Sequence, residues 1–150
     1  VQGLYRDNPT ADYFNSALAS MLVAYVKARR GHHADARLRI LEIGAGTGGT
    51  SAAVFERLKP YASSIESYCY TDVSPAFLSH ARKTFGPDVP YLTYQIFDVE
   101  QPLAAQGIEI GAYDVVIAAN VLHATRNIRA TVRNAKAALK RNGLLLINEI

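Results

Sequence analysis

Short apolar segments alternate with amphipathic segments along most of the chain, and this alternation constrains the fold more than any other feature. Apolar runs of strand length occupy residues 39–43, 67–71, 92–97, 113–118 and 144–150. Segments with helical periodicity lie between them, at 49–58, 75–85 and about 127–140. Strands separated by helices form right-handed crossovers and a parallel sheet. The sequence therefore predicts a doubly wound α/β fold with a mostly parallel sheet.

A helical segment precedes the first predicted strand. Asn8 can cap a helix, and apolar residues then recur at spacings of three and four until Gly31, which we expect to end the helix. We therefore divide the chain into a helical lead segment, residues 1–37, and a core at residues 38–150. Tyr5 in the lead segment either reaches over the core as a lid or packs at the entry of the helix.

The composition excludes several classes of protein. With 49% hydrophobic and 19% charged residues, the 150-residue chain is typical of a globular domain. No apolar run approaches the roughly 20 residues that span a bilayer. The net charge of +3 is too small to indicate a nucleic-acid partner. The single cysteine, Cys69, fits a small buried side chain in a reducing, cytoplasmic setting, and metal-ligand spacing is absent.

The glycine-rich stretch LEIGAGTGG follows the first predicted strand and has two readings. As G-x-G-x-x-G it is typical of a loop that binds a dinucleotide pyrophosphate. As E-x-G-x-G-x-G it runs through Glu42, Gly44, Gly46 and Gly48. A carboxylate two residues before the first glycine repels a pyrophosphate, whereas it attracts the ammonium and sulfonium groups of S-adenosylmethionine. The charge of Glu42 therefore favours S-adenosylmethionine.

Two more acids end successive strands. Asp72, at the end of YCYTD, can accept hydrogen bonds from both hydroxyls of a ribose, a feature that NAD enzymes share. Asp98 follows the third strand and can accept from an adenine amine, with Phe97 or Val99 against the ring. Either acid alone is better explained as a turn or helix cap. Three acids at three strand ends, behind a glycine loop, favour an adenosine-type ligand.

The motifs LEIGAGTGG, YTDVS, FDVE and VVIAANVLHAT together resemble class I S-adenosylmethionine-dependent methyltransferases over about residues 38–149. The segments TDVSPAFL, ANVLHAT and LLLINE resemble, more specifically, the C-methyltransferase domains of polyketide and hybrid polyketide–peptide synthases. The resemblance implies a Rossmann-like fold, truncated here after the fifth strand, within a larger multifunctional polypeptide. The absence of Met at Val1 agrees with that expectation.

His123 and Glu149 follow the fourth and fifth strands, which would be neighbours in such a sheet. A carboxylate that holds a histidine makes a general base, and the resemblance implies that this pair is the catalytic dyad. The implied substrate is a β-ketoacyl thioester on the phosphopantetheine arm of an acyl carrier protein, methylated at its α-carbon without a metal. Asn120 would support either the enolate oxygen or the methionine end of the cofactor.

Several alternatives stay open at this point. The same scaffold could methylate oxygen or nitrogen of a small molecule, or bind the cofactor without chemistry. An NAD-dependent oxidoreductase is a further possibility, because the glycine pattern alone is shared. A stripe of basic residues on the last predicted helix is either a solvated face or a docking surface for an acidic carrier protein; its members are Arg126, Arg129, Arg133, Lys136 and Lys140.

Overall fold

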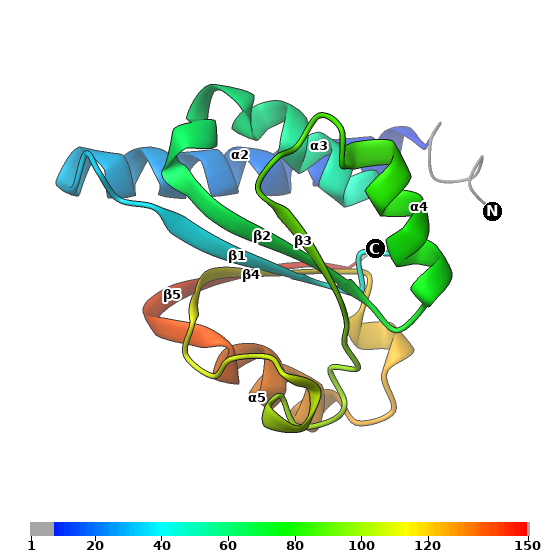
Figure 1. Ribbon diagram of the computed structural model, residues 1–150. Helices are drawn as coiled ribbons and strands as arrows, with labels where there is room; N and C mark the ends of the chain where they lie inside the picture. Colours follow the sequence, from blue (N-terminus) through cyan, green and yellow to red (C-terminus); the bar gives the residue numbers. More distant parts are fainter. Residues whose placement is uncertain (1–7, 150) are drawn as a thin grey trace.

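The computed structural model describes residues 8–149 and forms one five-stranded sheet with helices on both faces (Figure 1). All neighbouring strands are parallel, and their order across the sheet is β3-β2-β1-β4-β5. The chain starts in the middle of the sheet, winds outward to β3, and then returns to β4 and β5. The predicted doubly wound α/β fold is confirmed.

The strands and helices follow the predicted order closely. The strands are β1 (Leu38–Ile43), β2 (Ile65–Asp72), β3 (Leu92–Ile96), β4 (Tyr113–Ala119) and β5 (Leu139–Asn148). The helices are α2 (Pro9–His32), α3 (Gly49–Leu58), α4 (Pro75–Phe85) and α5 (Ile128–Ala137). Three short 3-10 helices complete the list: η1 (Lys59–Ser64), η2 (Ala104–Gln106) and η3 (Leu122–Ala124). Among the helices of this described part, none is long and apolar enough to cross a membrane.

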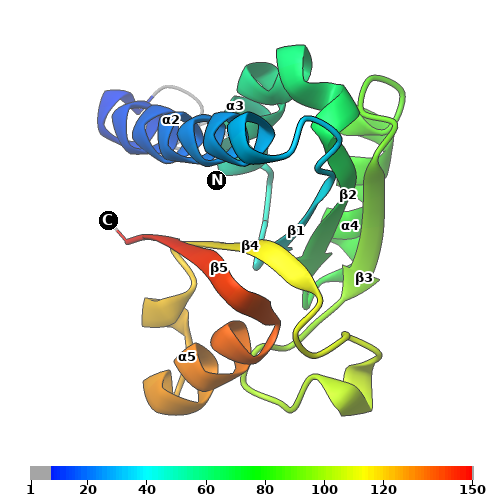
Figure 2. The same cartoon turned by 90° about the vertical axis from the view of Figure 1, so that its left-hand side faces the viewer.

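Helices α2, α3 and α4 cover one face of the sheet, as Figure 2 shows from the edge of the strands. The Asn8 side chain caps α2 by accepting hydrogen bonds from the backbone N–H groups of Thr10 and Ala11. Leu22 and Val26 of α2 are fully buried in the same core as Ile40 of β1. Whether the lead segment 1–37 is a separate unit stays a prediction, but α2 shares its core with the sheet.

The predicted end of α2 at Gly31 is wrong, because the helix continues to His32. A single glycine near a helix end costs only about 1 kcal/mol relative to alanine. The helix stops where His33 becomes extended, while the N–H group of His33 still donates to the carbonyl oxygen of Arg29.

Helix α5 and the loop at residues 97–112 cover the opposite face (Figure 2). Their core contains Phe97, Leu103 and Ala135, packed against Ile43 and Val116 of the central strands. Another side chain on this face, Cys69, is 5% exposed and lies among these apolar residues. Burial raises the pKa of its thiol, as expected of a cysteine that packs rather than reacts.

The boundary between α5 and β5 differs from the prediction. Helix α5 ends at Ala137, because the carbonyl oxygen of Ala138 accepts hydrogen bonds from the N–H groups of Ala112 and of Tyr113, the first residue of β4. Strand β5 begins at Leu139, and its register against β4 shifts before Leu144. A turn at Asn142, which has a φ of 65°, produces this shift. Asparagine tolerates this left-handed conformation better than most residues.

Candidate active site

His123 and Glu149 meet at the carboxyl edge of the sheet. The Nδ1 atom of His123 lies 2.6 Å from Oε2 of Glu149. The other carboxylate oxygen, Oε1, accepts hydrogen bonds from the backbone N–H groups of Val121 (3.0 Å) and Leu122 (2.7 Å). Burial alone would raise the pKa of Glu149, but the hydrogen bonds from His123 and these two amides lower it. The carboxylate therefore stays ionised and holds the imidazole ring in place.

The pairing of β4 with β5 brings these two residues together. Ala119 pairs with Asn148, and the N–H group of Asn120 donates to the carbonyl oxygen of Asn148 at 2.7 Å. Asn120 has a φ of 55°, so the chain turns sharply at the end of β4. This turn leads directly into η3, which carries His123, while Glu149 is the next residue after β5. The adjacency of these two parallel strands thus brings residues 26 apart in sequence to this distance.

The glycine loop after β1 has the backbone that its sequence predicts. Gly44, Gly46 and Gly48 all have positive φ, between 59° and 89°. A Cβ atom on Gly44 would lie 2.7 Å from the side chain of Val121, and one on Gly48 would lie 2.7 Å from the ring of Phe85. No other residue type therefore fits at either position without displacing a neighbour.

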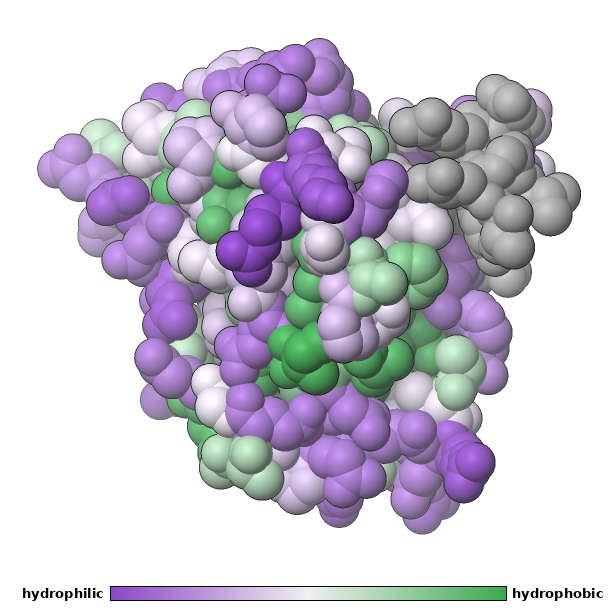
Figure 3. Space-filling model, turned by 45° about the vertical axis from the view of Figure 1, so that its right-hand side comes forward, coloured by the Kyte–Doolittle hydropathy of each residue, from purple (hydrophilic) through white to green (hydrophobic). Residues whose placement is uncertain are grey.

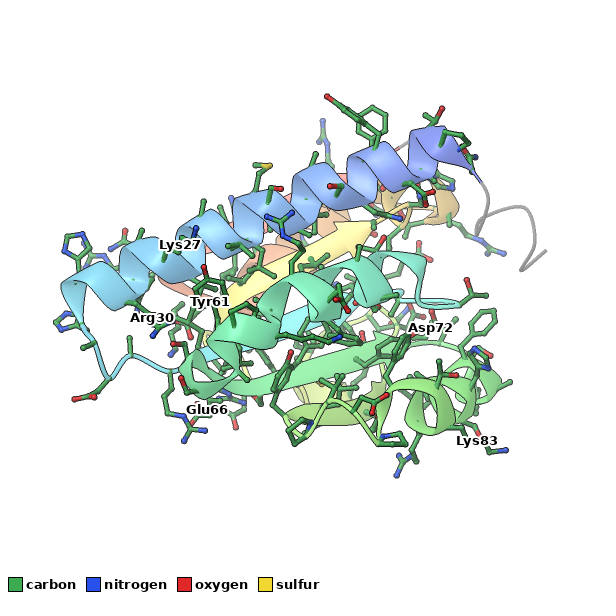
Figure 4. All side chains as sticks on the ribbon, turned by 90° about the horizontal axis from the view of Figure 1, so that it is seen from above. Lys27, Arg30, Tyr61, Glu66, Asp72 and Lys83 are labelled. Carbon is green, nitrogen blue, oxygen red and sulfur yellow. The ribbon has the colours of Figure 1, made fainter. Side chains whose placement is uncertain are left out.

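Strand β2 holds this loop through three consecutive residues. The Asp72 carboxylate accepts hydrogen bonds from the N–H groups of Gly46 and Ser74, each at 2.9 Å. The Tyr70 hydroxyl donates to the carbonyl oxygen of Gly46 at 2.8 Å, and the carbonyl oxygen of Thr71 accepts from the N–H group of Ala45. Figure 4 labels Asp72 beside this loop. These contacts with β2 hold the loop in its conformation.

Tyr70 was not among the predicted site residues. Tyr68, Tyr70 and Asp72 alternate along β2 and therefore share one face of the sheet. That alternation was the signal available in the sequence, but the contact with Gly46 depends on where the loop folds back.

Glu42 lies in the core below the loop rather than at its surface. It is 1% exposed, and its Oε1 atom accepts hydrogen bonds from the hydroxyls of Ser51 and Tyr68. Burial raises the pKa of this carboxyl to about 7, against the opposing effect of those two hydrogen bonds. The Glu42 carboxyl is therefore held beneath the loop by Ser51 of α3 and Tyr68 of β2.

The residues after β3 form a compact turn on the other face. The Asp98 carboxylate accepts a hydrogen bond from the N–H group of Glu100, and the Gln106 side chain bonds to both backbone polar groups of Asp98. Phe97 and Val99 are 1% and 5% exposed and belong to the α5-side core. These hydrogen bonds hold the turn at Asp98 on the carboxyl edge of the sheet, and the buried side chains of Phe97 and Val99 anchor it to the core.

A pocket of about 400 Å³ lies on the α2 side of the glycine loop, between α3 and α4. Asp12, Asn15, Gly48 and His80 are among the residues that line it. Neither the strand-end acids nor the dyad contributes to its lining. Tyr5, the candidate lid residue, lies outside the described residues. Across residues 8–149, no group of three or more His, Cys, Asp or Glu side chains could hold a metal ion.

The comparison with known proteins identifies the family. A family model described as "Methyltransferase domain" matches residues 41–145. The chain belongs to this methyltransferase family. It is 62% identical over 150 residues to the polyketide synthase PksR of Bacillus subtilis (strain 168), and the match covers all of this chain and 6% of that protein. The methyltransferase is therefore similar to one small part of a multidomain polyketide synthase.

Two solved structures support the assignment to this family. The crystal structure of DszA carbon methyltransferase matches with a TM-score of 0.90 and 43% identity, over 98% of this chain and 38% of that one. The trans-methyltransferase CalH, in complex with SAH, matches with a TM-score of 0.75 and 38% identity, over 96% of this chain and 40% of that one. The predicted resemblance to polyketide synthase C-methyltransferase domains is confirmed.

Proposed function

We propose that this methyltransferase uses S-adenosylmethionine to methylate the α-carbon of a β-ketoacyl thioester carried on the phosphopantetheine arm of an acyl carrier protein. The contact between His123 and Glu149, beside the ordered glycine loop, carries the proposal. The similarity to synthase domains and to carbon methyltransferases supports the substrate class. The carrier and the neighbouring synthase domains would be its partners, without nucleic acid.

In this proposal His123 is the general base and Glu149 its positioning carboxylate. When Nδ1 donates its proton to Glu149, Nε2 is left as an acceptor. The His123 side chain is 60% exposed, so Nε2 is accessible to a substrate that approaches the carboxyl edge. After proton transfer, the ionised Glu149 stabilises the imidazolium. Because the α-carbon lies between two carbonyl groups, its proton is acidic enough for this base to remove.

The residues at the loop fit the adenosine part of the cofactor. Asp72 has two carboxylate oxygens, each with one backbone donor, so lone pairs remain for ribose hydroxyls. Val73, the next residue, is 64% exposed and offers an apolar surface to an adenine ring. Figure 3 shows hydrophobic residues gathered in the middle of one face. Phe77 of α4 and Ile96 of β3 are also among the exposed apolar side chains.

S-adenosylmethionine, when bound, supplies an electrophilic methyl group and leaves as S-adenosylhomocysteine, so no metal is required. The role of the chain is to orient the two reactants and to remove the proton. Gly44, Gly46 and Gly48 would let the backbone approach the cofactor closely. Glu42 would add negative charge beneath the loop, and Asn120 would donate to the enolate or to the methionine end.

Mass spectrometry of a β-ketoacyl-pantetheine thioester incubated with S-adenosylmethionine tests the proposal. We expect a product with one added methyl group on the α-carbon, and no product from the His123→Ala variant. Binding of S-adenosylhomocysteine to that variant, measured by calorimetry, should be nearly unchanged, since within residues 8–149 the His123 ring bonds to Glu149 and forms no hydrogen bond with the loop. Methylation on oxygen, or full activity of His123→Ala, would refute the proposal. A cytoplasmic location stays a prediction that rests on the single cysteine.

A further inference from the structure

The positive charge of this protein is concentrated in one stretch of the chain. Residues 115–148 contain six Lys or Arg and no Asp or Glu. The whole chain contains 16 Lys or Arg and 13 Asp or Glu, so the residues outside this stretch have more acids than bases. The net charge of +3 is therefore produced entirely by β4, α5 and β5 with their connections.

The cations of α5 differ from most others in their surroundings. Elsewhere, Lys27 and Arg30 lie over the ring of Tyr61, as Figure 4 shows. Arg39 and Lys59 also pair, with Glu109 and Glu56. By contrast, no side chain within residues 8–149 forms an ion pair or ring contact with Arg126, two residues before α5, or with the cations on α5, which are Arg129, Arg133 and Lys136.

Lys140 does not belong to this group, although the sequence pattern included it. It lies beyond the end of α5, and its Nζ atom is 3.2 Å from the buried carboxylate of Asp114. The basic surface is thus shorter than predicted. We call it the α5 basic face, defined by Arg126, Arg129, Arg133 and Lys136.

An apolar groove runs along the same face. It is a shallow hollow of about 490 Å³ on the surface of α5 alone, lined by Ile128, Arg129, Val132, Arg133 and Lys136. Ile128 is 55% exposed, while the buried side of the helix is formed by Thr131 and Ala135. Apolar side chains framed by cations suit a partner helix with the opposite pattern, apolar in the centre and acidic at its edges.

The α5 basic face also begins next to the dyad. Helix α5 contacts η3, which carries His123, and only residues 125–127 separate the two helices. In Figure 2, α5 lies on the face of the sheet opposite α2, α3 and α4. A protein that docks on α5 therefore approaches the carboxyl edge from the side where the base is exposed.

We infer that the α5 basic face is the docking surface for the carrier protein that presents the thioester, through an acidic helix of that carrier. The inference rests on the proposed function, because it takes the carrier as the source of substrate. Charge complementarity mainly accelerates encounter and orients the partner. Docking on α5 would thus raise the rate of reaction with carrier-bound substrate and leave the chemistry at His123 unchanged.

The test compares two substrates in the full-length protein, a β-ketoacyl group on its acyl carrier protein and the same group on free pantetheine. In the variant Arg129→Glu/Arg133→Glu, kcat/KM for the carrier-bound substrate should fall about tenfold or more. The value for the pantetheine thioester should stay the same. Added salt should lower kcat/KM for the unaltered protein and have little effect on the variant.

A matched control is Arg37→Glu/Lys83→Glu, which changes the net charge equally at exposed positions away from α5 (Lys83 is labelled in Figure 4). It should leave both substrates nearly unaffected. A milder variant, Arg129→Gln/Arg133→Gln, removes the two charges without reversing them. It should show about half the effect on kcat/KM, expressed as free energy, and it keeps the test valid if Arg129→Glu/Arg133→Glu misfolds.

Equal losses in the α5 variant and the control would overturn the inference, since net charge alone would then explain them. A parallel loss with the pantetheine thioester would also overturn it, and would indicate that another part of the same protein covers α5. Failure of the proposed function gives a different result, because the unaltered protein would then not methylate the pantetheine thioester at carbon.

Discussion

Tyr70 and Tyr94 form a matched pair that tests whether β2 orders the glycine loop. The two residues are register partners on neighbouring strands, and their ring centroids are 6.2 Å apart. The hydroxyl of Tyr70 donates to the carbonyl oxygen of Gly46, whereas the buried hydroxyl of Tyr94 has no partner within residues 8–149. Replacement by phenylalanine removes the hydroxyl oxygen from either residue, but only the replacement of Tyr70 removes a hydrogen bond.

The magnitudes follow from those surroundings. A net hydrogen bond contributes about 0.5–1.5 kcal/mol, so Tyr70→Phe should lower the free energy of unfolding by about 1 kcal/mol. Since the lost bond holds Gly46, the Kd for S-adenosylhomocysteine should rise about three- to tenfold. An unsatisfied buried hydroxyl costs about 1–3 kcal/mol, so Tyr94→Phe should leave stability unchanged or raise it. Its ring would keep the contact with Arg82, whose guanidinium carbon lies 4.7 Å from the centroid.

Urea denaturation gives the two stabilities, and isothermal titration calorimetry gives the two affinities. The reasoning predicts that the variants separate in both measurements. If Tyr70→Phe binds S-adenosylhomocysteine as tightly as the unaltered protein, the loop does not depend on β2 in the way described. If Tyr94→Phe weakens binding as much as Tyr70→Phe, the ring packing and not the hydroxyl orders the loop.

Three other outcomes are expected. Burial raises the pKa of Glu42 from 4.5 to about 7, so its ionisation opposes folding. In urea titrations, the free energy of unfolding should fall by about 2.5 kcal/mol as the pH rises from 5 to 8, and Glu42→Gln should flatten that slope. Gly48→Ala places a Cβ 2.7 Å from Phe85 at a φ of 89°. It should abolish S-adenosylhomocysteine binding in calorimetry, whereas Gly31→Ala, with open space around it, should raise the melting temperature slightly. Glu149→Gln keeps an acceptor for the two amides but loses its charge, so kcat should fall about 100-fold with little change in melting temperature.

The order of strands and helices was predictable because each segment carries its own signal. Apolar runs of strand length, segments with helical periodicity, the Asn8 cap and the glycine loop all agree with the final fold. The end of α5 was not predictable in this way. Residues 138–140 continue a helical pattern, but the backbone of Ala138 is used by the loop before β4. That competition is between distant parts of the chain and leaves no local signal.

In the site, too, some features have a signal in the sequence and others depend on contacts between distant segments. The contact between His123 and Glu149 was predictable, because it follows from neighbouring parallel strands and the end of each strand. The burial of Glu42 could be predicted in part. Leu38, Ile40 and Glu42 alternate along β1, so all three face the core under α2, α3 and α4. The two hydroxyls around Glu42 come from a strand and a helix elsewhere, and their convergence depends on the packed structure.

The attachment of Glu149 to both His123 and the amides of Val121 and Leu122 makes the dyad an all-or-none feature. Successive residues of a strand point to opposite faces, so a slip of one residue between β4 and β5 would carry the carboxylate away from the histidine and from both amides together. No intermediate register retains a weakened base. Proton abstraction, in the proposed reaction, would therefore report whether the last strand of this chain has docked correctly, and a partly assembled sheet could hold the cofactor while remaining chemically silent.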